Sequence, residues 1–359
     1  MVRGIEIHPI THLIDLTRTN TDLPEKQASI PASATPSYDI DFADVSGQIH
    51  VKRALEIAAA GAHNLIMLGP PGAGKTMLAR RMPTILPDLT FDESIEITKI
   101  YSVAGLLDAK NQNNLITQRP FRTPHHTASY IALTGGGRVP KPGEISLAHN
   151  GVLFLDELPE FQKKALETLR QPLEDGMITL NRVGGVCTYP SQILLLAAMN
   201  PCPCGYQGLP SCKCTEAEIA RYLNKISGPL LDRIDIMVEA TPVAFNELNP
   251  ESAIPAEASA TVKTRVESAR VRQLARFANT DTRFNAKMSA KLVKKYCKLK
   301  PEANELLKQV FDTLSMSARA YHKILKIART IADLADAPDI ETPHVAEAIS
   351  YRGLDRKYW

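Results

Sequence analysis

The chain has 359 residues, of which 44% are hydrophobic and 23% charged, which is typical of a folded protein and excludes disordered and collagen-like classes. No stretch reaches the roughly 18 consecutive apolar residues of a membrane span, and the first residues lack a secretory layout, so we expect a soluble, cytoplasmic protein without a membrane partner. The net charge is only +3, but residues 261–300 carry +10, a bias found on polyanion-binding surfaces and, more often, on solvated helix faces.

The first 40 residues are predicted to be a linker. Residues 17–40 are rich in Thr, Pro, Ser and Ala and show little apolar periodicity. The short apolar pattern of residues 5–16 is too small to fold alone. We therefore expect the folded part to begin near Asp41.

Short apolar runs after this point predict the strands of a parallel sheet. A helical pattern over residues 45–60 is followed by runs at 65–68, 152–155 and 193–198, and by a weaker one at 234–238. Strands buried on both faces look like this, and helical stretches between them indicate a doubly wound α/β domain, here over residues 41–242. The strand pattern then ends, and residues 243–359 are predicted to form an all-helical lid domain, with helices at 261–278, 287–297, 302–314, 317–334 and 343–350.

A complete phosphate-binding motif follows the first predicted strand and precedes a helix. Glycines let backbone N–H groups surround phosphate oxygens at a helix N-terminus, so a nucleotide such as ATP is the expected ligand. Lys75 would reach the β and γ phosphates, and Thr76 would ligate Mg²⁺. A glycine-rich turn that binds nothing is the alternative, which this context makes unfavourable. The motif comprises Gly69, Pro70, Pro71, Gly72, Ala73, Gly74, Lys75 and Thr76.

Polar residues at the ends of two later strands are candidates for hydrolysis. Asp156 would hold the magnesium, and Glu157 would orient and deprotonate the attacking water. Asn200, at the end of another strand, would position the same water, although Asn-Pro is most often a turn. Arg233 precedes the last strand, where a paired surface arginine is the ordinary interpretation.

Two insertions are candidates for polymer binding. Residues 135–143 form a glycine-rich, mobile loop with Arg138 and Lys141, and residues 177–189 indicate a β-hairpin with Arg182 near a glycine turn. Basic tips without aromatic residues suit a phosphate backbone better than a polypeptide. Solvated loops with incidental charge remain the alternative.

Four of the six cysteines form a C-x-C-x₇-C-x-C cluster: Cys202, Cys204, Cys212 and Cys214. This matches the ligand count of a structural Zn²⁺ site, although the usual gap is two residues, and unliganded reduced cysteines are the alternative. Cys187 and Cys297 stand alone and are expected to be packed. The pair His125-His126 lacks a partner ligand in sequence reach, and we assign it no catalytic role.

Several strings together resemble the bacterial ComM/YifB family of magnesium-chelatase-like AAA+ ATPases, with coverage from about Asp41 to Arg356. The general AAA+ features are GPPGAGKT at 69–76, GVLFLDEL at 151–158, AMNP at 198–201 and LLDR at 230–233. The more specific strings are RPFRTPHHT at 119–127, GEISLAHNG at 143–151, LRQPLEDG at 169–176 and NPCPCG at 200–205.

This resemblance implies a hexameric ring that hydrolyses ATP between subunits and drives branch migration of DNA in natural transformation. Arg233 becomes the arginine finger, and Arg319 becomes a second nucleotide sensor on the helical lid. Lys75, Glu157, Asn200 and Arg233 are then the catalytic set. Members of the family usually carry a Lon-protease-like N-terminal domain, for which only a stub would fit before Asp41. The alternatives are a magnesium-chelatase motor subunit and a MoxR-like chaperone that acts on a protein partner.

Overall fold

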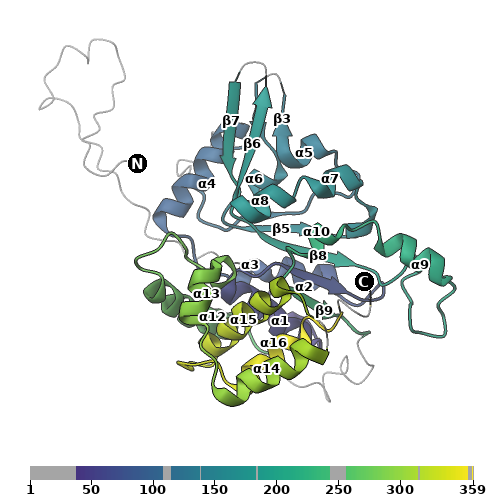
Figure 1. Ribbon diagram of the computed structural model, residues 1–359. Coiled ribbons are helices and arrows are strands. Elements are labelled where there is room, and N and C mark those ends of the chain that lie inside the picture. Colours follow the sequence, from purple (N-terminus) through teal and green to yellow (C-terminus); the bar gives the residue numbers. More distant parts are fainter. Residues whose placement is uncertain are drawn as a thin grey trace, which may run out of the picture.

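A computed structural model describes residues 38–107, 115–137, 139–182, 185–242, 256–313, 316–354 and 358 (Figure 1). At its centre is a five-stranded sheet in the order β2-β5-β8-β1-β9, in which every neighbouring pair is parallel. The predicted α/β class is therefore confirmed. The strands are β1 (Leu65–Leu68), β2 (Phe121–Arg122), β5 (Val152–Leu155), β8 (Leu194–Met199) and β9 (Ile236–Glu239). Residues 1–37 of the predicted linker lie outside the described residues.

The strands are uninterrupted apolar runs because both faces of the sheet are covered. Leu65 and Met67 of β1 join one hydrophobic cluster, and the alternating Ile66 and Leu68 join the other. All four side chains are fully buried. Burial of each such side chain is worth about 1.5–3 kcal/mol, so this strand is a main source of stability for the sheet.

Short helices and turns cover the two faces. On one face lie α1 (Ile49–Gly61), α2 (Lys75–Arg80) and α3 (Met82–Ile85). The longest helix of this part, α4 (Phe91–Ala104), begins at a capping box formed by Thr90 and Glu93 and ends where Gly105 adopts a left-handed conformation. The other helices are α5 (Tyr130–Thr134), α6 (Glu144–Leu147), the 3₁₀ helix η4 (Leu158–Glu160), α7 (Lys163–Glu167), α8 (Arg170–Asp175), α9 (Glu216–Leu223) and α10 (Gly228–Leu231); a further 3₁₀ turn is η3 (Phe42–Asp44).

The C-terminal part is helical, as predicted, and packs behind α1. Buried residues of α1, β1, α12, α15 and α16 form one continuous cluster. The elements are α12 (Ser259–Arg276), the 3₁₀ helix η5 (Asn285–Lys287), α13 (Ala290–Tyr296), α14 (Pro301–Thr313), α15 (Ala318–Leu334) and α16 (Thr342–Ser350). Asp333 of α15 is fully buried and accepts a hydrogen bond from Arg276 (Nη1–Oδ2, 2.7 Å), with Arg329 also in contact. Among the described residues, no helix is long and apolar enough to cross a membrane.

Two antiparallel hairpins project from the α/β part beside each other (Figure 1). The larger hairpin consists of β6 (Met177–Arg182) and β7 (Gly185–Pro190), as the sequence predicts. The smaller hairpin consists of β3 (Gly135–Gly136) and β4 (Lys141–Pro142), where a loop was expected. Glycine permits this pairing, because a Cβ on Gly135 would lie 2.2 Å from the Lys141 carbonyl oxygen. Tyr189 Oη donates to the Pro140 carbonyl oxygen at 2.7 Å and connects the two hairpins.

Candidate functional site

The predicted phosphate loop connects β1 to α2, and its backbone is open toward solvent. Gly72 and Gly74 both have φ of +79°, and a Cβ at either position would meet nothing within 4 Å. Glycine is therefore favoured here by backbone conformation rather than by crowding. By contrast, a Cβ on Gly69 would lie 2.2 Å from the Ala240 carbonyl oxygen, so this end of the loop is held against the chain that follows β9.

Lys75 extends back into the loop. Its side chain is buried, with 8% of the residue exposed, and Nζ donates to the carbonyl oxygens of Gly69 (2.7 Å) and Pro70 (2.8 Å) and to Asn200 Oδ1 (3.2 Å). Burial lowers the pKa of the Lys75 ammonium, and the Asp156 carboxylate opposes this. The ammonium is thus directed at the space enclosed by the loop, where phosphate oxygens could replace the carbonyls.

Thr76 and Asp156 form the second part of the site. Thr76 Oγ1 donates to Asp156 Oδ2 at 2.6 Å, and Asp156 Oδ1 accepts from the backbone N–H of Glu157 at 2.9 Å. A hydroxyl and a carboxylate side by side are the hard oxygen ligands that Mg²⁺ prefers. With Asn200, these groups lie at the carboxyl ends of three adjacent strands, β1, β8 and β5, which is where ligands bind in open α/β sheets.

Glu157 has a strained backbone and a partner that the sequence did not reveal. Its φ is +51°, which is uncommon for a residue with a side chain and is often found at functional sites. Its Oε2 lies 3.0 Å from His126 Nδ1, and the His126 ring packs against His125 with centroids 4.1 Å apart. His126 and Glu157 meet because β2 and β5 are parallel neighbours, so the segments that follow these two strands leave the sheet at the same end. Only the strand order could have indicated this contact.

The two predicted arginines, Arg233 and Arg319, lie near the amino ends of the strands, opposite the end that carries the phosphate loop. Arg233 precedes β9, and its carbonyl oxygen accepts from Asn64, which precedes β1. Its guanidinium donates to the Arg170 carbonyl oxygen at 3.2 Å and pairs with Glu174. Arg319 Nη1 lies 2.9 Å from Asp232 Oδ2, and its side chain is 71% exposed. The structure thus brings Arg233 and Arg319 to one region, but not to the phosphate loop of the same chain.

Asp235 anchors the start of β9. Its Oδ2 lies 3.4 Å from His63 Nδ1. Burial favours a raised pKa for this carboxyl, but the hydrogen bond with His63 and the ammoniums of Lys323 and Lys326 outweigh it and lower the pKa to about 2. The carboxylate therefore stabilises the folded state at neutral pH.

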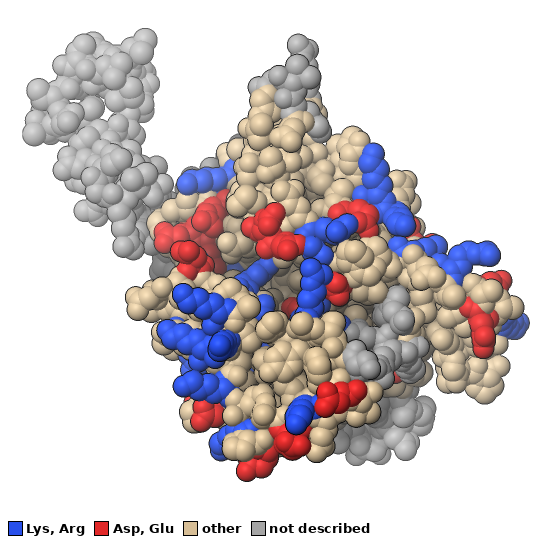
Figure 2. Space-filling view, viewed as in Figure 1, with Lys and Arg blue, Asp and Glu red and all other residues tan. Residues whose placement is uncertain are grey.

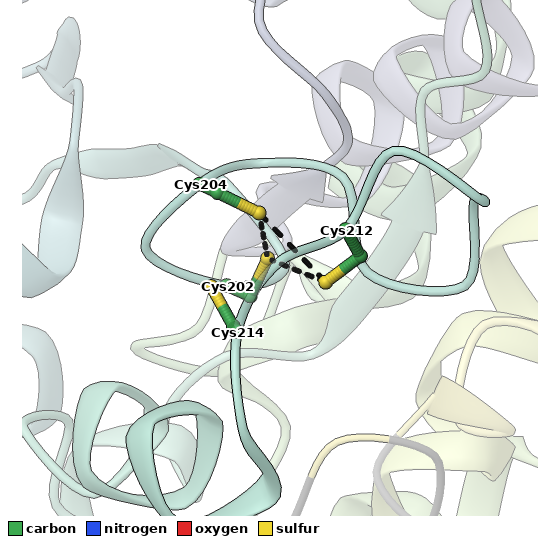
Figure 3. A group of neighbouring side chains, drawn as sticks. All are labelled: Cys202, Cys204, Cys212 and Cys214. Atoms are coloured by element: carbon green, nitrogen blue, oxygen red, sulfur yellow. Dashed lines mark hydrogen bonds between the residues drawn. The ribbon is translucent and has the colours of Figure 1, made fainter.

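The four clustered cysteines converge, as Figure 3 shows. Their sulfur atoms all lie within 4.8 Å of one another, and Cys202 is fully buried. None forms a disulfide. Backbone N–H groups of Lys213 and Tyr206 donate to Cys204 and lower the pKa of its thiol to about 6, whereas burial and the neighbouring thiols raise the pKa of Cys212 and Cys214. Cys297 is buried, as expected, and Cys187 is half-buried.

The candidate polymer-binding residues are only partly described. Lys141 is exposed on β4, and Arg182 is the last residue of β6, opposite Gly185 in the ladder. Arg138 lies outside the described residues. Tyr189 is the one aromatic residue of β6 and β7. Its ring is buried and its hydroxyl donates to the small hairpin, so it is not exposed for contact with a polymer.

Part of the basic segment is paired with acidic residues of the same chain. Figure 2 shows Lys and Arg side chains gathered over α12 and α13. However, Arg265 pairs with Glu56 and Glu257, and Arg272 pairs with Asp336. These two arginines of α12 therefore join elements of the chain to one another, whereas Lys291, Lys294 and Lys295 of α13 remain exposed.

Comparison with known proteins agrees with this arrangement. The family model described as "Magnesium chelatase, subunit ChlI" matches residues 41–248, and "Magnesium chelatase, subunit ChlI C-terminal" matches residues 256–352. The uncharacterized protein YifB of Escherichia coli is 48% identical over 317 residues, which are 88% of this chain and 61% of YifB. Competence protein ComM of Haemophilus influenzae is 46% identical, with the same shares covered. An uncharacterized protein of Mycobacterium tuberculosis is 42% identical over 98% of this chain and 69% of its own length.

The chain spans about three fifths of the length of the YifB and ComM proteins that it matches. The matched region includes the phosphate loop, both hairpins, the cysteine cluster and the C-terminal helices. With two family models covering most of the chain and this level of identity, the chain belongs to the ComM/YifB family of magnesium-chelatase-like AAA+ proteins.

Proposed function

We propose that this chain is the ATP-hydrolysing motor of a ring-shaped DNA translocase that promotes branch migration. The observation that supports this most directly is the meeting of Lys75, Thr76, Asp156 and Asn200 at one edge of the sheet. Family membership, with its AAA+ domain, supports ATP as the nucleotide.

In this proposal, the phosphate loop holds the β and γ phosphates with its backbone N–H groups and Lys75. Thr76 and Asp156 hold Mg²⁺, which when bound supplies positive charge against the charge of the transferred phosphoryl group. Glu157 takes a proton from the attacking water, and Asn200 orients that water. Asn200 is suited to this because its amide already contacts Lys75 and lies beside the loop.

The arginines at the opposite edge support a site shared between copies of the chain. Arg233 lies at the amino end of β9, whereas the phosphate loop follows the carboxyl end of β1. An arginine finger placed there would serve the nucleotide of an adjacent subunit, with Arg319 beside it as a sensor. Arg233 would first exchange its partner Glu174 for phosphate, so that hydrolysis would depend on assembly into a closed ring, which we propose to be a hexamer.

DNA is the polymer that the hairpins suit best. Lys141 and Arg182 belong to the two projecting hairpins and could contact a phosphate backbone in a central pore. We propose the same role for Arg138, which lies outside the described residues. The Haemophilus relative is named a competence protein, which is consistent with DNA handling during natural transformation. The competing proposal is a magnesium-chelatase-like motor that remodels a protein, since a magnesium-chelatase 67 kDa subunit of Chlorobaculum tepidum is 25% identical over 57% of this chain.

The test is the dependence of ATP hydrolysis and of strand exchange on DNA structure. We expect three-way and four-way junctions to stimulate the ATPase and to be resolved into products only with ATP. Arg182→Ala should weaken DNA binding and flatten its salt dependence while basal hydrolysis is retained, because it removes one phosphate contact per subunit. Lys308→Ala, an exposed lysine of α14, is the matched control. A rate of ATP hydrolysis that is the same without DNA and with single-stranded, duplex or branched DNA would contradict the proposal.

A further inference from the structure

The cysteine cluster is built against the phosphate loop. Cys202 follows Asn200, the residue that accepts from Lys75, by only two positions. The turn from Cys202 to Gly205 closes with a hydrogen bond from the Gly205 N–H to the Cys202 carbonyl oxygen at 3.0 Å. A Cβ on Gly205 would lie 2.6 Å from Pro71 Cδ and 3.7 Å from Asn200 Cγ. The turn that carries two of the cysteines is therefore in direct contact with the loop and with Asn200.

The sulfur atoms have the spacing of a tetrahedral metal centre. Three Sγ–Sγ distances are 3.4 Å (Cys202–Cys204), 3.9 Å (Cys202–Cys212) and 3.7 Å (Cys204–Cys212). Four sulfurs at about 2.3 Å from one Zn²⁺ would be separated by about 3.8 Å at tetrahedral angles. A disulfide would require about 2.05 Å, so the observed spacing fits a shared ion and not a bridge. An all-thiolate set with no open position is typical of structural zinc.

The segment that holds the cysteines is ordered by turns and not by regular secondary structure. Residues 201–215, between β8 and α9, contain no helix or strand. A loop of this length without regular structure is costly to hold in one conformation, and a metal that cross-links its two ends removes much of that cost. The cross-link would fix both the turn against Pro71 and the start of α9, whose Tyr222 and Leu223 are buried against the sheet.

We propose that the cluster is a structural zinc site and that its occupancy holds the phosphate loop in the form that binds nucleotide. The second half of this inference rests on the proposed function of the loop. Loss of zinc frees the turn at Gly205, removes the support behind Pro71 and Asn200, and lowers nucleotide affinity without any change in the residues that contact phosphate.

The experiment measures zinc and nucleotide binding separately on the full chain. Zinc content is determined by plasma mass spectrometry, and affinity by titration with a fluorescent N-methylanthraniloyl-ATP in the presence of Mg²⁺. We expect about one zinc per chain for the wild type, and a large loss of zinc in Cys204→Ser and Cys212→Ser. The dissociation constant should rise about 5-fold or more in these variants, the range of ordinary coupling between sites. Cys187→Ser, outside the cluster, should keep both values.

A second arm avoids reliance on the variants. Wild-type protein is stripped with a chelator selective for zinc over magnesium and then reconstituted with Zn²⁺, with helical content followed by circular dichroism. Affinity should fall on stripping and return on reconstitution. Wild type with well under one zinc per chain overturns the metal site. Stripped protein with unchanged affinity, or with global loss of helix, overturns the coupling. Zinc-loaded wild type that binds no nucleotide overturns the proposed function and the coupling, and leaves the metal site standing.

Discussion

The side chain of Lys75 offers the sharpest test of the phosphate loop. Lys75→Met removes the ammonium and retains most of the volume of a buried side chain. In the structure the ammonium donates to three oxygens at 2.7, 2.8 and 3.2 Å. A hydrogen bond to a charged group contributes about 1.5–3 kcal/mol, and we expect Lys75→Met to cost at least one such bond to phosphate. At about 1.4 kcal/mol per factor of ten, the dissociation constant for Mg-ATP should rise about 10- to 150-fold.

The assay is calorimetric titration of Mg-ATP into the wild type and the variant at one pH and salt concentration. Lys308→Met, an exposed lysine on α14, controls for a general effect of charge and should bind as the wild type does. Thermal unfolding of both variants shows whether the fold is intact. An affinity for Lys75→Met within twofold of the wild type, in a folded protein, would refute the assignment of this loop to phosphate binding.

Three further predictions address Glu157, the proposed catalytic base, and the stability of the fold. His126→Ala should lower ATP turnover about 10-fold with unchanged nucleotide affinity, because Glu157 loses its positioning partner; steady-state kinetics that show equal or faster turnover would contradict this. The pKa of Asp235 is lowered, so its contribution to stability is complete above about pH 4 and is lost as the pH falls toward 2. In urea titrations, the difference in free energy of unfolding between wild type and Asp235→Asn should therefore shrink by about 2 kcal/mol between about pH 4 and pH 2. A difference that stays constant with pH would contradict the lowered pKa of Asp235. Asp333→Ala should cost about 3–5 kcal/mol because it leaves the buried Arg329 without its carboxylate partner. Asp336→Asn, at an exposed pair and with a residue that tolerates the φ of +58° at this position, should cost less than about 1 kcal/mol in the same denaturation assay.

The sequence predicts the elements that carry strong local signals. Strands β1, β5 and β8 are continuous apolar runs and were predicted to within about one residue of their observed ends. The hairpin of β6 and β7 is indicated by its glycine turn. The five C-terminal helices were all predicted, because their apolar residues recur at helical spacing.

Other features depend on which elements become neighbours, and local patterns do not contain that information. Strand β2 has two residues and no periodic signal. The contact of His126 with Glu157 requires the pairing of β2 with β5. The amphipathic stripe of α15 predicts that it is buried, but not that it packs against α1 and so lies behind the sheet. For the same reason, the sequence could place Arg233 before a strand but could not show that its own chain holds it through Glu174.

The shared core of α1 and the C-terminal helices has a mechanical consequence. Ala58, Ala59 and Ala60 of α1 are fully buried in the cluster that also contains residues of α12, α15 and β1. Close packing of this kind resists sliding, since a displaced helix would open voids along its whole length. A subunit built in this way would carry force as one stiff block. In the ring that we propose, a working stroke would then arise from rocking between neighbouring subunits, with the two hairpins moving together as the tip of each block.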